Sequence, residues 1–220
     1  MRNFTAIVPF RASSKGLPRK NFLLLNDQPL WKRAVLQAQR TCSETIYSTD
    51  HSLSVSDRAE IKGIYDKRPD ILATDDTLLE EVLIYLIREY ELYSENLVLL
   101  QTTSPLRLDE HIKNACELFS TRNYSMVMSV VKKDNLSLKY GLLGSENNFE
   151  FINKPCYCFE NRQNLPEVFG PNGAVYVFNA LTFLESNSFP HKNIGVIKMS
   201  ADHSLDIDSE ENYKQVLSLL

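Results

Sequence analysis

Short apolar runs rich in strand-forming residues alternate along this chain with segments whose apolar residues recur at helical spacing. The run FTAIVPF (4–10) is followed by the helix-like segment PLWKRAVLQAQR (29–40) and then by ETIYSTD (44–50). Alternation of this kind predicts βαβ units, in which crossover helices join parallel strands. The N-terminal part of the chain is therefore predicted to build a parallel sheet.

The same alternation continues to the end of the chain. Further helices are indicated by the stripes Leu79, Val82, Leu83, Leu86, Ile87, Tyr90 and Ile112, Ala115, Cys116, Phe119, and by Tyr213, Val216, Leu217, Leu220 in a last helix from about Glu210. Further strands are indicated by NLVLLQ (96–101), YSMVMSVV (124–131), GAVYVF (173–178) and IGVIKM (194–199). Between them, the polar stretch of about 132–170 contains only short strand-like pieces. We predict a doubly wound, mostly parallel α/β sheet with a small β-rich excursion at 132–170, all in a single domain over residues 1–220.

Composition excludes several classes of protein. With 220 residues and 43% hydrophobic side chains, the chain can bury one full core. The formal net charge of -4 argues against a protein that grips nucleic acid. The first apolar run is too short for a membrane span, and the four cysteines show neither CxxC nor zinc-ligand spacing. We expect a cytoplasmic protein with reduced thiols and no membrane or nucleic-acid partner.

A basic segment, RASSKGLPRKN (11–21), follows the first predicted strand directly. Its cations are Arg11, Lys15, Arg19 and Lys20, set beside Gly16 and Pro18. Ligands of doubly wound sheets bind beyond the carboxyl ends of the strands, so this position favours a phosphate-binding loop over a merely solvated basic turn. Neither GxGxxG nor GxxxxGK[ST] occurs, which disfavours a dehydrogenase and a P-loop NTPase.

The sequence SLDIDSEEN (204–212) offers a metal site. If it is a strand, Asp206 and Asp208 point to one face while Leu205 and Ile207 point to the other. Neighbouring carboxylates repel unless a cation lies between them, and Mg²⁺ accepts one or two carboxylates together with substrate phosphates. The alternative is that Asp208 or Ser209 simply caps the last helix.

These segments together resemble the acylneuraminate cytidylyltransferases, or CMP-sialic acid synthetases. The resemblance runs nearly end to end and in the correct order: VPFRASSKGLPRKN (8–21), YSTD (47–50), RPDILATDD (68–76), LLQTTSPLR (99–107), RQNLPEVFGPNGAVYVF (162–178) and SLDIDSEEN. It implies a Rossmann-like fold, CTP as co-substrate, Mg²⁺ as cofactor, and a homodimer in which the excursion of one subunit reaches across its partner.

The resemblance also implies roles for particular residues. The expected nucleotide-binding set is Arg11, Lys15, Lys20, Asn21, Arg68 and Gln101. The expected sugar-binding set is Gln101, Lys139, Arg162, Asn172 and Tyr176. Asp206 and Asp208 are the expected metal ligands and, with Lys20, the expected catalytic residues. The implied reaction transfers CMP from CTP to the anomeric hydroxyl of a nine-carbon, sialic-acid-type sugar acid and releases pyrophosphate.

Two positions depart from the pattern of the family. Gly170 stands where the family usually has Arg before PNG, and DTLLEE (76–81) replaces a Thr/Ser-rich segment. Two other functions therefore stay open: transfer of CMP to Kdo or another sugar on the same scaffold, and nucleotide binding without catalysis. The histidines His51 and His203 have no evident acid/base partner and are left out of the expected catalytic set.

Overall fold

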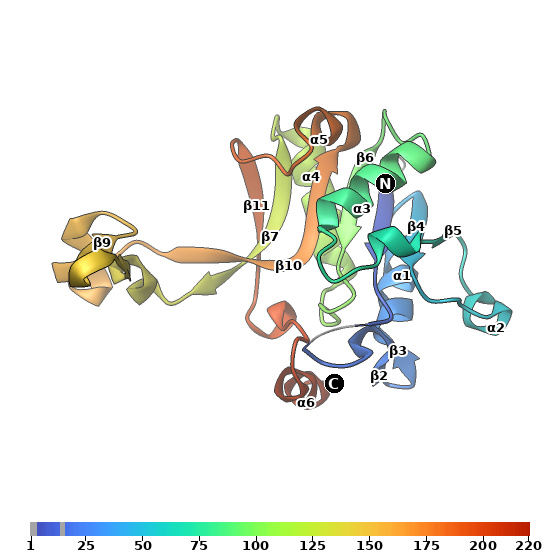
Figure 1. Ribbon diagram of the computed structural model, residues 1–220, viewed down its shortest axis with the longest axis horizontal. Coiled ribbons are helices and arrows are strands. Elements are labelled where there is room, and N and C mark those ends of the chain that lie inside the picture. The colour runs from blue at the N-terminus through green and yellow to red at the C-terminus, as the bar shows by residue number, and fades with distance from the viewer. Residues whose placement is uncertain (1–3, 14–15) are drawn as a thin grey trace.

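A seven-stranded mixed sheet forms the centre of the protein, as the computed structural model shows for residues 4–13 and 16–220 (Figure 1). In spatial order, the strands are β11 (Ile194–Met199), β7 (Met126–Lys133), β10 (Val168–Asn179), β6 (Asn96–Leu100), β1 (Phe4–Pro9), β4 (Glu44–Thr49) and β5 (Ile64–Lys67). β10 runs antiparallel to both β6 and β7, and the other neighbouring pairs are parallel. The predicted doubly wound, mostly parallel sheet is confirmed.

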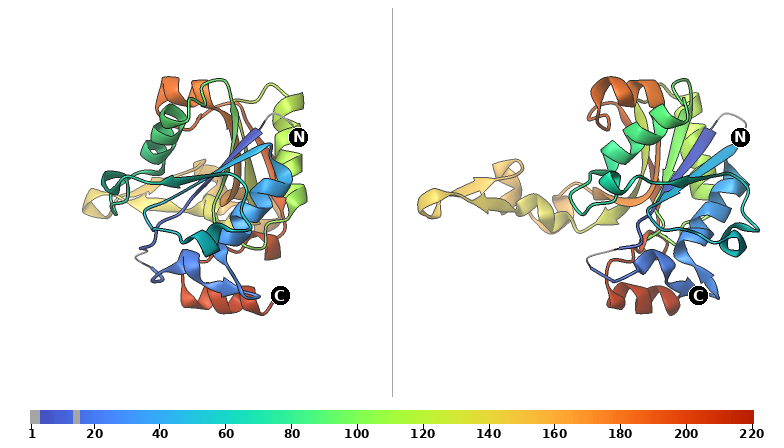
Figure 2. Two further views of the ribbon diagram at one scale, coloured as in Figure 1. Left: turned by 90° about the vertical axis from the view of Figure 1, so that its right-hand side faces the viewer. Right: turned by 45° about the vertical axis from the view of Figure 1, so that its right-hand side comes forward.

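Helices cover both faces of the sheet (Figure 2, left). On one face, α1 (Leu30–Thr41) and α4 (Asp109–Thr121) pack on a core that includes Phe10, Trp31 and Val98. On the other face, α3 (Leu79–Glu89) and α5 (Ala180–Ser186) pack on a core that includes Ile7, Leu99 and Phe178. Each central strand is thus buried on both sides, which explains its unbroken apolar sequence.

The remaining elements are short. They comprise β2 (Leu24–Leu25), β3 (Gln28–Pro29), α2 (Val55–Arg58), β8 (Gly141–Leu143), β9 (Phe149–Phe151), α6 (Glu210–Leu217) and the 3₁₀ turns Lys20–Phe22, Asp70–Leu72, Asn135–Lys139, Ser145–Asn147, Pro155–Phe159, Arg162–Asn164 and Asp202–Ser204. α6 and the β2–β3 pair lie just beyond the carboxyl end of β1, at the bottom of Figure 1.

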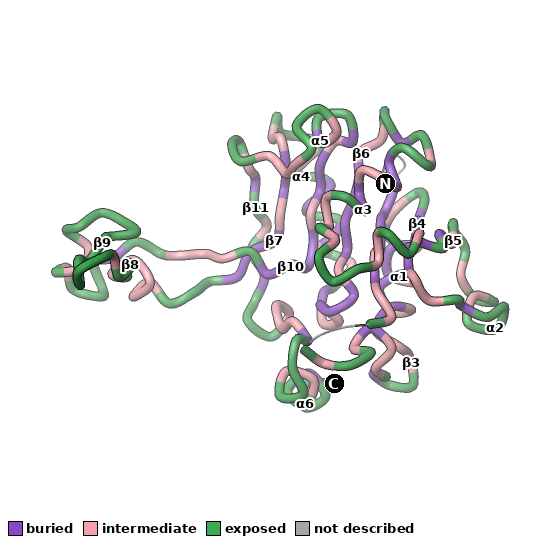
Figure 3. The backbone as a smooth tube through the Cα atoms, viewed as in Figure 1, coloured by how far each residue is buried: buried purple, intermediate pink, exposed green. Residues whose placement is uncertain are grey.

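The excursion between β7 and β10 projects from the sheet as an arm, which we define as residues 134–167 (Figures 1 and 2). As predicted, it contains short strands, β8 and β9, which pair over three residues each. The rest is folded into 3₁₀ turns at Asn- and Pro-containing sequences, which suit turns better than strands. Most of the arm is exposed (Figure 3).

Three finer predictions also differ from the structure. Leu217 and Leu220 are exposed, so the buried stripe of α6 reduces to Val216 with the half-buried Tyr213. The PNG sequence lies inside β10 rather than before it, at a break in register between Pro171 and Tyr176. Residues 205–208 form an extended loop rather than a strand, since Ile207 makes one backbone hydrogen bond, to Thr103 O at 2.9 Å.

The core on the α3 face predicts a large difference between two phenylalanines. Phe178 is 0% exposed and packs on Phe183 and Phe189 at centroid distances of 5.1 and 5.4 Å, whereas Phe159 on the arm is 87% exposed. Phe178→Ala should lower the free energy of unfolding by about 3–5 kcal/mol. Phe159→Ala should change it by less than about 0.5 kcal/mol. Urea denaturation of both variants checks this, and equal effects would contradict the packing described.

Candidate active site

A cleft of about 410 Å³ opens at the carboxyl ends of β1, β5 and β6. Its walls come from the loop after β1, from the first turns of α3, from the segment after β6 and from the loop before α6. The lining residues are Pro9, Phe10, Arg11, Ser13, Lys20, Asn21, Arg68, Leu72, Thr77, Leu79, Val82, Gln101, Thr102, Thr103, Asp206 and Asp208. Chemistry-bearing residues from distant parts of the chain therefore share one cavity.

The loop after β1 is shaped by a 3₁₀ turn. Arg19 adopts a left-handed backbone conformation with φ 54°, and residues 20–22 then turn so that Lys20 and Asn21 line the cleft. Phe22 packs on Phe10 and His51, with ring centroids 6.1 and 4.9 Å apart. At Gly16, the Cβ of any other residue would lie 2.8 Å from the backbone oxygen of Asp208. The loop therefore passes directly against the segment that carries the carboxylates.

Asn21 fastens this loop to the end of β6. Its amide nitrogen donates to Arg11 O at 2.8 Å, and its amide oxygen accepts from the Thr102 hydroxyl at 2.5 Å. The side chain is buried, yet the cleft still reaches it. Asn21 thus positions the cleft wall as well as lining it, and each of its amide atoms keeps one further hydrogen-bonding position.

Arg68 holds the ends of three neighbouring strands together. Its guanidinium donates to Ser48 Oγ at 3.2 Å, to Ser48 O at 2.9 Å and to Phe10 O at 3.4 Å. The residue is only 4% exposed, and burial lowers the pKa of the guanidinium. The charges of Asp50 and Asp66 act in the opposite direction, so Arg68 is a buried cation with two carboxylates nearby, and it lines the cleft.

Gln101 lies across from β10. Gly173 has φ +76°, the left-handed region that favours glycine, and a Cβ there would lie 2.6 Å from Gln101 Oε1, so glycine leaves room for the Gln101 side chain in this position. Arg107 secures the same segment by donating to Gln101 O at 3.1 Å and to Ala174 O at 2.7 Å. The cleft wall after β6 is therefore rigidly tied to β10.

Asp206 and Asp208 reach the cleft because Ile207 between them is buried. Ile207 packs in a small cluster with Leu25, Leu30 and Val216, away from the main cores. In an extended segment, burial of the middle side chain directs both neighbours to the opposite side. The expected pairing of the carboxylates thus holds although the segment is not a strand. Ser209 caps α6 through Asn212 N, so capping does not engage Asp208.

The two carboxylates have different environments. Burial, and in addition the charge of Asp208, raises the pKa of Asp206 to about 6, against a hydrogen bond from Thr103. Lys20 Nζ lies 2.5 Å from Asp208 Oδ1 and lowers the pKa of Asp208. Asp206 Oδ1 is buried and lacks a hydrogen-bond partner within the described chain. An oxygen in this state is suited to a cation ligand.

No group of three or more His, Cys, Asp or Glu residues with the placement of a metal site occurs within residues 4–13 and 16–220. A metal at this cleft would therefore have two protein carboxylates and take its other ligands from substrate and water. That is the donor set that Mg²⁺ accepts and zinc does not.

The structure brings together most of the nucleotide-binding and metal-binding residues expected from the sequence. Arg11, Lys20, Asn21, Arg68, Gln101, Asp206 and Asp208 all line the cleft. Arg11 contacts the 74–77 loop through Thr74 O at 2.6 Å and Asp75 at 3.2 Å. Lys15 lies outside the described residues.

The expected sugar-binding residues are dispersed. Tyr176 lies near Asp206, whose charge adds to burial in raising the pKa of the phenol. Asn172 is buried in hydrogen bonds with Ser129 Oγ at 2.5 Å and Ser204 Oγ at 2.9 Å, and it does not line the cleft. Lys139 and Arg162 are on the arm, where they bond to Glu160 O and Asp134. Asn172, Lys139 and Arg162 are therefore not among the described residues that line the cleft.

Three threonines that the sequence analysis did not single out as site residues line the cleft: Thr77, Thr102 and Thr103. Thr102 and Thr103 lie inside the matched segment LLQTTSPLR, directly after a buried strand, and this position was the available signal. Thr77 lies in the DTLLEE segment, and its hydroxyl is 2.8 Å from that of Thr74. It supplies a hydroxyl in the segment that replaces the Thr/Ser-rich segment of the family.

Comparison with known proteins identifies the family. The sequence model of the family described as Cytidylyltransferase matches residues 5–142, which include the loop after β1 and the end of β6. An N-acylneuraminate cytidylyltransferase of Escherichia coli O18:K1:H7 is 32% identical over 97% of this chain. The chain belongs to the cytidylyltransferase family.

Several relatives in the family are longer than this chain. It spans about half the length of the first N-acylneuraminate relatives, 51% for the E. coli protein and 52% for that of Streptococcus agalactiae serotype V. A CMP-N,N'-diacetyllegionaminic acid synthase of Legionella pneumophila is 31% identical, and the match covers 93% of this chain and 90% of the relative.

Solved structures of other proteins have the same fold as this chain. A CMP:2-keto-3-deoxy-manno-octonic acid synthetase complexed with CTP superposes with a TM-score of 0.71 at 13% identity, over 99% of this chain and 98% of the other. A 4-diphosphocytidyl-2C-methyl-D-erythritol synthase superposes with a TM-score of 0.66 at 10% identity, over 100% of this chain and 99% of the other. None of the described helices has the length and apolar character needed to cross a membrane.

The buried oxygen of Asp206 predicts an unusual substitution. A buried oxygen without a hydrogen-bond partner costs about 1–3 kcal/mol of stability, and Asn removes the negative charge whose burial raises the pKa of Asp206. Asp206→Asn should therefore be no less stable than the wild type at neutral pH in metal-free buffer. Its partner variant Ile207→Ala, which opens a cavity, should lose about 2–5 kcal/mol. Denaturation curves compare the two, and a strongly destabilised Asp206→Asn would contradict the environment described.

Proposed function

We propose that this protein is a Mg²⁺-dependent cytidylyltransferase that transfers CMP from CTP to the anomeric hydroxyl of a sialic-acid-type nonulosonate and releases pyrophosphate. The observation that carries the proposal is the single cleft in which Lys20, Asp206 and Asp208 meet the basic loop after β1. Relatives at 30–32% identity are named N-acylneuraminate cytidylyltransferase, and one at 31% is named for diacetyllegionaminic acid, which supports a nonulosonate acceptor.

The residues of the cleft divide between binding and charge neutralisation. Arg11 and Lys20 are cations in the loop after β1, where they would hold the negative charge of a triphosphate. Arg68, which is bonded to the end of β4, adds a buried positive charge to the same cleft. Asn21 and Gln101 carry amides with free donor and acceptor positions, which suit a pyrimidine edge and a sugar hydroxyl. Lys15 is assigned to the triphosphate by resemblance alone.

The reaction needs no covalent enzyme intermediate. The anomeric oxygen attacks the α-phosphorus of CTP, the bond from this phosphorus to the bridging oxygen breaks, and pyrophosphate carries away the electron pair. Lys20 and Arg11 oppose the charge that develops on pyrophosphate. The proton of the anomeric hydroxyl passes to water in the cleft, because Asp206 and Asp208 are assigned to the cation.

The Mg²⁺ implied by the family resemblance fits this site. Asp206 and Asp208 would hold it, since the buried Asp206 Oδ1 lacks a partner within the described chain and Asp208 adds a second carboxylate. When bound, the ion neutralises phosphate charge and polarises phosphoryl oxygens. Lys20 pairs with Asp208 and offsets part of the repulsion between the two carboxylates.

The acceptor side is completed, in this proposal, by a second subunit. Lys139 and Arg162 are cations suited to a sugar carboxylate, but they lie on the arm, away from their own cleft. The arm exposes large apolar side chains, among them Leu143 at 76% and Phe159, as expected of a surface that pairs with another chain. We propose a homodimer in which each arm carries these residues toward the cleft of its partner.

The assay that tests the function measures pyrophosphate release from CTP and Mg²⁺ with a panel of acceptors. The panel contains N-acetylneuraminate, a legionaminate, a pseudaminate and Kdo. Release with a nine-carbon acid but not with Kdo supports the proposal. Release with Kdo alone would move the assignment to the eight-carbon acceptor, and no release with any sugar, despite CTP binding, would leave only nucleotide binding.

Removal of one carboxylate tests the metal assignment. Asp208→Ala should remain folded, because Asp208 is exposed, yet turnover should fall by roughly a hundredfold or more. Glu211→Ala, an exposed acid on the adjacent first turn of α6, is the matched control and should retain wild-type turnover. Near-wild-type turnover of Asp208→Ala in saturating Mg²⁺ would overturn the role of this residue.

Mixing two inactive variants tests the arm. Asp208→Ala damages the cleft and Arg162→Ala damages the arm, so a mixed dimer has one cleft in which both parts are intact if the arm acts on its partner. Random exchange of subunits should then restore about a quarter of the wild-type turnover, as expected for a symmetric dimer. If each arm served its own cleft, the mixture would stay as inactive as its components.

A further inference from the structure

A second cleft of about 410 Å³ lies against α1, where the segment from β6 to α4 passes over that helix. Its polar lining consists mainly of Arg33, Gln37 and Arg40 on α1 and Ser104, Arg107 and Asp109 from the segment. It opens on the face of the sheet that α1 covers, whereas the candidate active site reaches the first turn of α3 on the opposite face. Nothing in the proposed reaction uses these residues.

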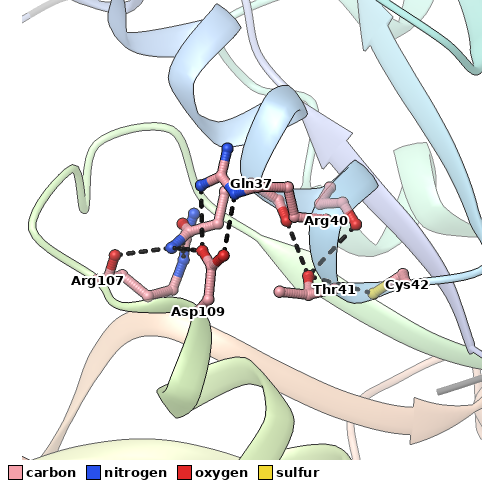
Figure 4. A network of polar contacts seen from close by, with 7 residues as sticks. Gln37, Arg40, Thr41, Cys42, Arg107 and Asp109 are labelled. Atoms are coloured by element: carbon pink, nitrogen blue, oxygen red, sulfur yellow. Dashed lines mark hydrogen bonds and ion pairs between the residues drawn. The ribbon is translucent and has the colours of Figure 1, made fainter.

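Positive charge exceeds negative charge in this cleft. Its lining holds three guanidinium groups and one carboxylate, that of Asp109. Asp109 is already engaged: Arg40 binds it through Nε at 2.9 Å and Nη2 at 3.1 Å, and Gln37 donates to it at 3.0 Å (Figure 4). The fork of Arg40 lowers the pKa of Asp109, which therefore stays ionised. Arg40 therefore has a carboxylate partner in this cleft, whereas Arg33 and Arg107 form no ion pair among the described residues.

The first unmatched cation is Arg107. Its guanidinium bonds only to neutral oxygens among the described contacts, including Gln37 Oε1 at 3.0 Å (Figure 4) and the carbonyl of Ala174. The residue is buried, and burial lowers its pKa to about 10, so it remains charged at neutral pH. Its field therefore reaches the cleft without a direct counter-ion.

The second unmatched cation is Arg33. Its hydrogen bond to Leu25 O is long, at 3.5 Å, and its Nε is buried with no partner among the residues that the structure describes. Burial and then repulsion by Arg40 lower the pKa of Arg33. Ser104 presents a further unsatisfied group: the side chain is 1% exposed, and Oγ finds no hydrogen-bond partner in the described parts of the chain. A buried donor in this condition is a position that a ligand oxygen or an ordered water can satisfy.

We propose that this cleft binds a small anion of the phosphate type. A dianion supplies the two negative charges that Arg33 and Arg107 lack, and its oxygens accept from Arg33 Nε and from the Ser104 hydroxyl. A neutral sugar or base would leave the excess charge in place, and a cation would be repelled. The site is separate from the nucleotide cleft, although Thr102 borders both.

The test is calorimetric titration with inorganic phosphate on four forms of the full chain. Arg33→Gln removes an unmatched cation of the second cleft, Lys20→Gln removes a cation of the candidate active site, and Arg122→Gln removes an exposed cation outside both clefts. Arg33→Gln should weaken phosphate binding at least tenfold, while Lys20→Gln and Arg122→Gln leave the second-cleft binding intact. Loss of all binding in Lys20→Gln, with wild-type binding in Arg33→Gln, would overturn the proposal.

Thermal unfolding separates loss of binding from loss of folding. Phosphate at about a hundredfold excess over the wild-type Kd should raise the Tm of the wild type by about 5 °C or more and that of Arg33→Gln by no more than about half as much. In phosphate-free buffer, Arg33→Gln should melt no lower than the wild type, because a buried Nε with no hydrogen-bond partner among the described residues has been removed. Ser104→Ala, a smaller change, should weaken phosphate binding severalfold without unfolding. Equal phosphate-induced shifts in the wild type and both variants would refute the site.

Discussion

The parallel pairing of β1 with strands on both of its sides is the constraint on which the rest of the structure depends. β1 lies between β4 and β6, and all three run the same way, so their carboxyl ends meet at one edge of the sheet. The crossover helices must then pass over opposite faces, α1 over one and α3 over the other. The loops that line the cleft are thereby gathered at this edge by backbone hydrogen bonding.

The charged side chains of the cleft are positioned mainly by the apolar packing of their neighbours in the chain. Ile207 is buried beneath the two aspartates, and Phe22 anchors the turn that carries Lys20. The ion pair of Lys20 with Asp208 joins a partly buried ammonium to an exposed carboxylate. The carboxylates and the cations are therefore preorganised by a small hydrophobic cluster that is separate from both main cores.

Periodicity predicted the elements that are buried on both faces, such as β6 and α3, because burial imposes a strict spacing on their apolar residues. It was wrong for Leu217 and Leu220, which face solvent, and it did not locate the 3₁₀ turns of the arm. For the site, resemblance of motifs predicted which residues converge from distant positions. It did not predict that Asn172 would be consumed by hydrogen bonds to Ser129 and Ser204, because those partners lie far away in the sequence.

β10 is continuous from the base of the arm to the middle of the sheet, yet its register breaks between Pro171 and Tyr176. On one side of the break it pairs with the end of β7 that leads into the arm, and on the other side it pairs with β6 and the buried part of β7. Insertions or replacements in residues 134–167 consequently leave the ladder of the inner sheet untouched. The arm can therefore change in length and sequence without a change in the strands that shape the cleft.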